Sequence, residues 1–111
     1  MNTKLNDQEV IIKEGIATQL KGIEAVTGRI YLTNQRLIFE SHTFNIQTGF
    51  TIVSINNIDS MEKSRPKIFG IIPTLSNALV IKTKDNQVFS FTVLKNTEWI
   101  KKLEEVKQDP I

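Results

Sequence analysis

The residues best suited to binding chemistry form a short basic stretch that is followed directly by an apolar one. The three bases are Lys63, Arg65 and Lys67, and the apolar side chains that follow are Phe69, Ile71 and Ile72. Bases beside an apolar loop can contact anionic headgroups while the apolar side chains insert shallowly into the membrane. Since each base near such a surface contributes on the order of 1 kcal/mol, three of them predict weak, salt-sensitive attachment. In the alternative interpretation, the apolar residues belong to the core and the bases only solvate a loop.

The same segment, residues 63–73, also fits contact with a protein. An uncovered apolar loop can dock on a partner, and an exposed edge strand can accept a strand from another chain or from a second copy. Residues 69–73 are apolar, are interrupted by Gly70 and end at Pro73, which predicts an edge strand or a folded-in loop. A protein partner, a homodimer and an anionic membrane are therefore the candidate partners of this segment.

Catalysis and metal binding find little support in the residues. A nucleophilic site needs an activating base beside Ser, Thr or Cys, and the single histidine, His42, lies in a polar stretch without a recognisable partner. The chain has no cysteine, so disulfides and thiolate metal sites are excluded. Arg36 could bind an anion, but pairing with Glu40 or with an acid on a neighbouring strand is its expected role. We therefore expect no enzyme, no metal and no cofactor.

The positive charge of the chain is concentrated in its second half. The 111 residues carry a net charge of +2, and residues 62–102 hold eight bases against three acids. This excess is too small to indicate nucleic acid, and the basic stretch has no interleaved aromatic residues on which bases could stack. No apolar run approaches the roughly 20 residues that span a bilayer, and no apolar signal-peptide core follows Lys4. We therefore expect a cytoplasmic protein, or one attached peripherally to a membrane.

Two-residue periodicity predicts that most of the chain forms antiparallel strands. The clearest case is residues 28–39, where Ile30 and Leu32 point one way and Tyr31 points the other. Asn34 tolerates positive φ, so it can open a tight turn within this hairpin. The predicted strands are residues 10–20, 24–33, 36–40, 50–55, 58–62, 78–83 and 88–93.

Three breaks in this pattern have structural interpretations. Gly15 predicts a bulge or a bend in the first strand. The polar residues 41–49 predict a loop. Asp85 and Asn86 predict a type I′ turn, because both residue types tolerate left-handed conformations.

The C-terminal segment changes to a helical period. Trp99, Leu103 and Val106 recur at the spacing of one helix face, and charged residues fill the remainder. Asn96 can cap this helix, and Pro110 cannot continue it. About three turns are too short to be stable alone in water. The helix is therefore expected to pack Trp99 onto an open end or face of a strongly bent sheet.

This order of elements resembles the GRAM domain of the pleckstrin-homology (PH)-like superfamily. Residues 28–39, GRIYLTNQRLIF, are similar to the family's G-x-L-Y-L-T-N-x-R-L-I-F core. Residues 52–58 are similar to its I-P-L-x-D-I segment, with Asn57 where an acid is usual. The third match consists of residues 79–81, residues 89–91 and the Trp99 helix. The resemblance implies about seven antiparallel strands in a PH-like barrel or sandwich, capped by one α-helix.

The resemblance also implies a binding module rather than an enzyme. Relatives that bind inositol phosphates gather bases around the turn after the first strand, where this chain offers Lys21 alone. We therefore expect a single domain over residues 9–108 that binds a protein in the cytoplasm. The alternative is phosphoinositide-like or other anionic lipid binding through residues 63–73. Residues 1–8 are expected to be disordered or loosely packed, and residues 109–111 to form a tail.

Overall fold

A computed structural model describes residues 1–21, 23–42, 50–64 and 78–108 of the chain. These residues form seven strands and one α-helix, which confirms the predicted mainly β fold. The elements in chain order are β1 (Ile11–Lys21), β2 (Glu24–Thr33), β3 (Arg36–Ser41), β4 (Phe50–Ser54), the 3-10 helix η1 (Ile55–Asn57), β5 (Ile58–Ser64), β6 (Ala78–Thr83), β7 (Val88–Val93) and α1 (Asn96–Gln108).

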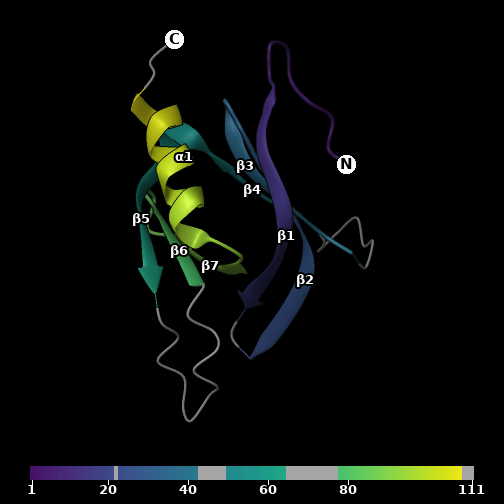
Figure 1. The fold of residues 1–111 in the computed structure, drawn as a ribbon, viewed down its shortest axis with the longest axis vertical. Helices are drawn as coiled ribbons and strands as arrows, with labels where there is room; N and C mark the ends of the chain where they lie inside the picture. Colours follow the sequence, from purple (N-terminus) through teal and green to yellow (C-terminus); the bar gives the residue numbers. More distant parts are fainter. Residues whose placement is uncertain (22, 43–49, 65–77, 109–111) are drawn as a thin grey trace.

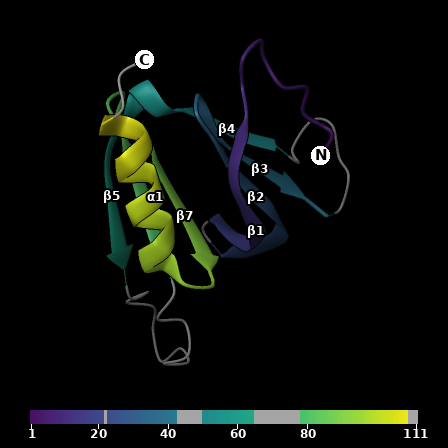
Figure 2. The same ribbon diagram turned by 45° about the horizontal axis from the view of Figure 1, so that its top comes forward.

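All seven strands belong to one antiparallel sheet that bends sharply at β1. The strand order is β4-β3-β2-β1-β7-β6-β5, so β4 and β5 are its two edges. β1 pairs with β2 along its whole length, but with β7 only from Ala17 to Leu20. The half made of β1 to β4 therefore crosses the half made of β5 to β7 steeply, and α1 lies over the second half (Figures 1 and 2).

The core lies between the two halves of the sheet, beneath α1. As the alternation predicts, Ile30 and Leu32 are fully buried in it. Phe39 and Phe91, from opposite halves, bring their ring centroids within 5.5 Å of each other. Trp99 is 4% exposed and belongs to the same cluster, so its predicted role as the anchor of the helix is confirmed.

Gly15 does not form the predicted bulge. The register of β1 against β2 shifts between Ile11 and Lys13 instead. Gly15 lies against the helix anchor, since a Cβ at this position would lie 3.4 Å from Trp99 Cζ2, which is an ordinary van der Waals contact. The Nζ of Lys13 lies 5.2 Å from the centroid of the Trp99 ring, so two residues of β1 lie close to the indole of α1.

The predicted type I′ turn between β6 and β7 is also wrong. Such a turn needs positive φ at both central residues, whereas only Asn86 has one, at 67°. The backbone N–H of Asn86 donates to the Thr83 carbonyl over 3.1 Å. The Thr83 hydroxyl also donates a hydrogen bond to Asp85. This bond lowers the pKa of the exposed Asp85 carboxyl, so local side-chain bonding shapes the turn.

Candidate functional site

Of the six predicted site residues, Lys63 is the one that falls within the described residues. It is exposed near the end of β5, next to the exposed Glu62. The other five, Arg65, Lys67, Phe69, Ile71 and Ile72, lie outside the described residues. Their predicted contacts with a membrane or a partner therefore stay predictions.

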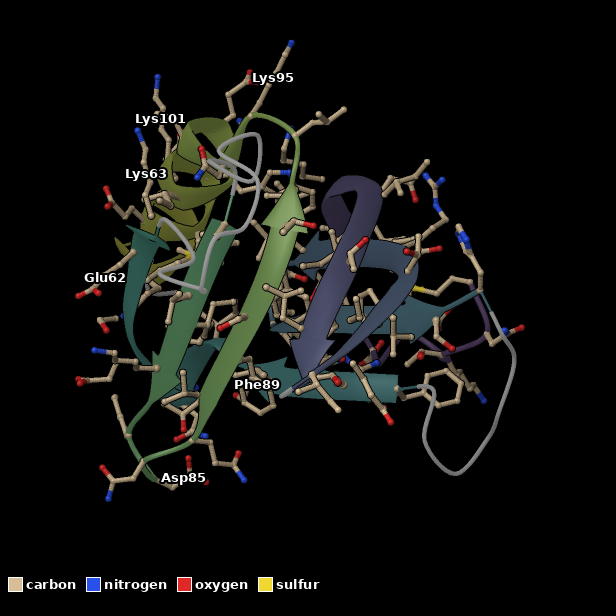
Figure 3. All side chains as sticks on the ribbon, turned by 90° about the horizontal axis from the view of Figure 1, so that it is seen from below. Glu62, Lys63, Asp85, Phe89, Lys95 and Lys101 are labelled. Carbon is tan, nitrogen blue, oxygen red and sulfur yellow. The ribbon has the colours of Figure 1, made fainter. Side chains whose placement is uncertain are left out.

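The fold places two further lysines on the same side of the molecule as Lys63. Lys95 lies in the turn between β7 and α1, and Lys101 is exposed on the helix. Figure 3 shows the three side chains on one side of the molecule, away from Asp85 and Phe89. The positive charge of Lys95 is partly offset by Glu98, since the Lys95 Nζ lies 3.9 Å from a Glu98 carboxylate oxygen. We call these three residues the basic side.

A second feature, which the sequence did not suggest, is the path of the first nine residues. They run over the β2–β3 hairpin, and we call them the N-terminal strap (Figures 1 and 2). The Glu40 carboxylate accepts hydrogen bonds from the backbone N–H groups of Asn2 and Thr3, at 3.0 and 2.6 Å, and from the Thr3 hydroxyl at 2.6 Å. This arrangement does not match the expectation of a disordered or loosely packed N-terminus.

Glu9 fixes the other end of the strap through a buried ion pair. Its side chain is 0% exposed, and the Arg36 guanidinium donates to both of its oxygens, at 2.9 and 3.0 Å. The Thr33 hydroxyl and the backbone N–H of Asn6 also donate to this carboxylate, at 2.6 and 2.7 Å. Arg36 therefore pairs neither with Glu40 nor with an acid of a neighbouring strand, but with the strap.

Asn34 has a different role from the predicted one. It does not have positive φ. Its Oδ1 accepts from the Val10 N–H at 2.9 Å, and its Nδ2 donates to the Gln8 carbonyl at 3.1 Å. The hairpin turn thus holds the chain where the strap enters β1.

The strap lies over a small buried apolar patch on the outer face of the sheet. Tyr31 and Ile38 face each other across β2 and β3 and are 4% and 0% exposed, yet neither belongs to the main core cluster. Ile38 lies between Arg36 and Glu40 on the same face of β3, and both of these bond to the strap. The strap is therefore held on the face of the sheet that carries this patch.

The two acids that hold the strap predict a loss of stability in acid. Burial raises the pKa of Glu9, but hydrogen bonds from Arg36, Thr33 and Asn6 outweigh it and hold the pKa below its ordinary value of 4.5. In the same way, burial raises the pKa of Glu40, but the hydrogen bonds from Thr3 and Asn2 lower this pKa by more. The pKa of Glu40 therefore also lies below its ordinary value. When the pKa of a carboxyl is lower in the folded state than in the unfolded state, the carboxyl stabilises the fold at any pH above its unfolded-state pKa. This stabilisation is lost as the pH falls through the folded-state pKa.

We therefore expect the free energy of unfolding to fall below about pH 4.5, the ordinary value of these carboxyls. Urea unfolding followed from pH 7 to pH 3 measures this dependence. The double variant with Glu9→Gln and Glu40→Gln should start less stable and lose less over the same range. An equal loss in both proteins would show that the strap acids are not responsible.

An open groove of about 1000 Å³ lies beside the strap. It runs between the β2–β3 turn, β4, η1 and the C-terminal end of α1. Five carboxamide side chains line it, those of Asn6, Gln8, Asn34, Gln35 and Asn56. It also has three basic side chains, those of Arg36, Lys84 and Lys107, while none of the described residues that line it is acidic. Because Glu9 neutralises Arg36, the groove is polar and its positive charge comes from Lys84 and Lys107.

The family is decided by a comparison of the sequence with known families. The profile of the GRAM domain matches residues 1–108. This chain belongs to the GRAM domain family. The matched range includes the N-terminal strap.

Solved structures agree with a PH-like fold for this GRAM domain. The C-terminal domain of an unknown protein from Leishmania infantum superposes with a TM-score of 0.74 at 18% identity, over 91% of this chain and 86% of that one. The PH domain of Slm1, described as binding ligand in a non-canonical site, gives 0.66 at 15% identity, over 88% and 98%. The DH/PH fragment of PDZRHOGEF in complex with human RhoA gives 0.67 at 14% identity, over 92% and 30%. No curated protein matches the chain.

The described part of this GRAM domain contains no group of three or more His, Cys, Asp or Glu side chains that could hold a metal ion. His42 is exposed at the end of β3, where its backbone N–H donates to the Thr27 carbonyl at 2.9 Å. Among the described residues, no helix has the length and apolar character needed to cross a bilayer.

Proposed function

We propose that this GRAM domain is a non-catalytic module that binds another protein through the groove between the strap, β4 and the end of α1. The observation that carries this proposal is the lining of the groove, where carboxamides and bases meet without an acid among the described residues. Carboxamides both donate and accept hydrogen bonds, and those of Gln8 and Asn56, which make no side-chain hydrogen bond within the described residues, can bond to a peptide backbone. Lys84 and Lys107, which form no ion pair within the described residues, favour an acidic partner. GRAM and PH-like domains are a module type that binds proteins or lipids.

A negative charge introduced inside the groove, compared with one introduced outside it, tests this proposal. Asn56 is exposed on η1 and faces the groove, whereas Lys101 is exposed on the basic side. Partners captured on the immobilised wild-type domain are identified, purified and titrated against Asn56→Glu and Lys101→Glu. We expect Asn56→Glu to weaken binding about tenfold, since one misplaced charge in an interface costs more than 1 kcal/mol. Equal affinities of the two variants, or weakening by Lys101→Glu alone, would contradict the proposal.

The basic side favours a second candidate function, attachment to an anionic membrane surface. Lys63, Lys95 and Lys101 point to one side of the molecule (Figure 3), and each base near such a surface contributes about 1 kcal/mol. A domain of this kind would act in the cytoplasm, peripherally at the membrane. The absence of cysteine fits a reducing compartment.

If this second function holds, the wild-type domain co-sediments with phosphatidylserine vesicles at low salt and is released at high salt. Replacing all three lysines with glutamine should then reduce binding about a hundredfold, at roughly 1 kcal/mol for each charge. Asn56→Glu, on the groove, serves as the control and should sediment like the wild type. No sedimentation of the wild-type domain at low salt would remove the membrane candidate.

A further inference from the structure

We infer that the free edge of β4 receives an extended, acidic segment of the partner protein as an added strand. This inference rests on the proposed function and names the mode of binding and the chemical class of the bound segment. The occupant is a peptide segment of another protein, because the edge supplies backbone groups and the neighbouring groove supplies positive charge. Neither a second copy of this chain nor a membrane meets both conditions.

The hydrogen-bond pattern of β4 shows which backbone groups face outwards. The Ile55 N–H donates to the Gln35 carbonyl at 3.0 Å. Since hydrogen-bonded pairs alternate with non-hydrogen-bonded pairs in an antiparallel ladder, Ile55 and every second residue before it are the ones that hydrogen-bond to the hairpin of β3. With Arg36 opposite Ser54 and Ile38 opposite Ile52, Ile52 and Ser54 turn their N–H and C=O groups away from β3. No described strand lies on that side of β4. These groups are therefore available to an incoming strand.

The two edge strands of the sheet differ in the features that oppose pairing with another chain. β5 carries Asp59, Glu62 and Lys63 and has α1 beside it. Charged side chains on an edge strand oppose pairing with another chain. β4 reads Phe-Thr-Ile-Val-Ser and has neither a charge nor a proline, and Ile52 is 49% exposed. Of the two edges, β4 is the one whose sequence permits strand addition.

The groove reaches the C-terminal part of β4, and its bases set the charge of the segment. Ile52 and Ser54 of β4 are among its lining residues. Lys84 and Asn56 also line it, and within the described part of the chain neither side chain is engaged in a hydrogen bond or ion pair. A strand laid along β4 would pass these two side chains, and acidic residues on it would complement Lys84. A second copy would bring its own uncharged β4 and the same bases, so its charge would not be complementary.

Ser54→Pro removes an outward N–H while leaving the backbone conformation unchanged. Ser54 has φ of −64° and ψ of 137°, which lie within the range that proline adopts. Its N–H makes no bond to β3, so the ladder between β3 and β4 stays intact. Ser54→Ala is the matched control, because it removes the hydroxyl and keeps the N–H. Unfolding in urea shows whether both variants retain the fold.

The experiment selects a displayed library of random linear peptides on the full wild-type domain and titrates the enriched peptides against both variants. We expect the enriched peptides to be acidic, to bind Ser54→Ala like the wild type, and to bind Ser54→Pro about fivefold or more weakly, as the loss of a backbone hydrogen bond implies. In addition, Lys84→Gln should weaken the acidic peptides.

Three results would overturn the inference. If enriched peptides bind Ser54→Pro as tightly as the wild type, β4 is not the acceptor, although the domain still binds a protein segment. If sedimentation shows a wild-type dimer that Ser54→Pro dissolves, the occupant is a second copy. If no peptide is enriched, the edge does not accept an extended segment. The purified partner used with Asn56→Glu tests the proposed function separately.

Discussion

Replacing Gly28 with alanine will lower the free energy of unfolding by about 3 kcal/mol or more, as expected when a side chain is forced into a closed space. Gly28 pairs with Ser41 at the end of the register between β2 and β3 that lies away from the hairpin turn. A Cβ at this position would lie 2.0 Å from the Glu40 carbonyl oxygen and 2.6 Å from the Ser41 Cα. Both are backbone atoms of β3, so no side-chain rotation can relieve the overlap, and the two strands would have to separate.

Gly15→Ala is the matched control for this substitution. It makes the same chemical change in the neighbouring strand, but its Cβ would lie 3.4 Å from Trp99 Cζ2. Alanine also restricts the unfolded chain more than glycine does, so we expect a change within about 1 kcal/mol. Urea unfolding of both variants gives the comparison. Similar stabilities for Gly28→Ala and Gly15→Ala would contradict the close approach of β2 and β3.

Replacing Arg36 with methionine will have the second large effect, about 3 kcal/mol, because it leaves Glu9 buried without its partner. The Glu9 side chain is 0% exposed and that of Arg36 is 15% exposed. Arg36 also donates to the Lys4 carbonyl at 2.7 Å, so its loss frees both halves of the strap. The measured loss will be smaller if the strap detaches locally and water reaches Glu9. Hydrogen exchange of the amides around Ile38 then reports the detachment.

A surface ion pair on the helix supplies the control. Lys102 lies 3.6 Å from Glu105, with both side chains about half exposed, and Lys102→Met should cost less than about 1 kcal/mol. The deficit of Arg36→Met should also shrink as the pH falls below about 4.5, because a protonated Glu9 no longer needs the guanidinium. If Arg36→Met and Lys102→Met were equally stable at pH 7, the strap would not depend on this ion pair.

Most of the fold follows from local patterns in the sequence. Alternation in the β2–β3 hairpin identified its inward residues, and the helical spacing of Trp99, Leu103 and Val106 identified α1. These patterns are sufficient to predict the strands and the helix, because each pattern depends only on residues a few positions apart in the sequence. Gly28 is the exception within the hairpin. Its residue type suggests backbone freedom, but what requires a glycine there is the approach of β3, which only the paired structure shows.

The candidate sites are much harder to predict from the sequence than the fold is. The sequence predicts that Arg36 pairs with an acid on its own or a neighbouring strand. Its partner is instead Glu9, which precedes β1 and lies 27 residues away along the chain. Nothing in the polar segment before β1 indicates that it lies on the outer face of the sheet. The signal that could have found it is the apolar character of Tyr31 and Ile38, which the strand pattern places on a face expected to meet water. Such a face needs a cover.

The groove could not be predicted for a similar reason. It combines the strap, the β2–β3 turn, η1 and the end of α1, which only the bend of the sheet brings together. The sequence predicts a binding loop at residues 63–73 because its bases lie close together along the chain. The basic side, by contrast, joins Lys63 to Lys95 and Lys101, which lie more than thirty residues further along the chain.

Mapping the binding surface by NMR is the most direct test of the claim that this GRAM domain binds a protein segment at β4. The isotope-labelled domain is titrated with an enriched acidic peptide, and amide shifts are followed along the whole chain. We predict the largest shifts at Ile52, Ser54, Asn56 and Lys84, with little change at the basic side. Shifts centred on Lys63, Lys95 and Lys101, with β4 unaffected, would contradict the claim.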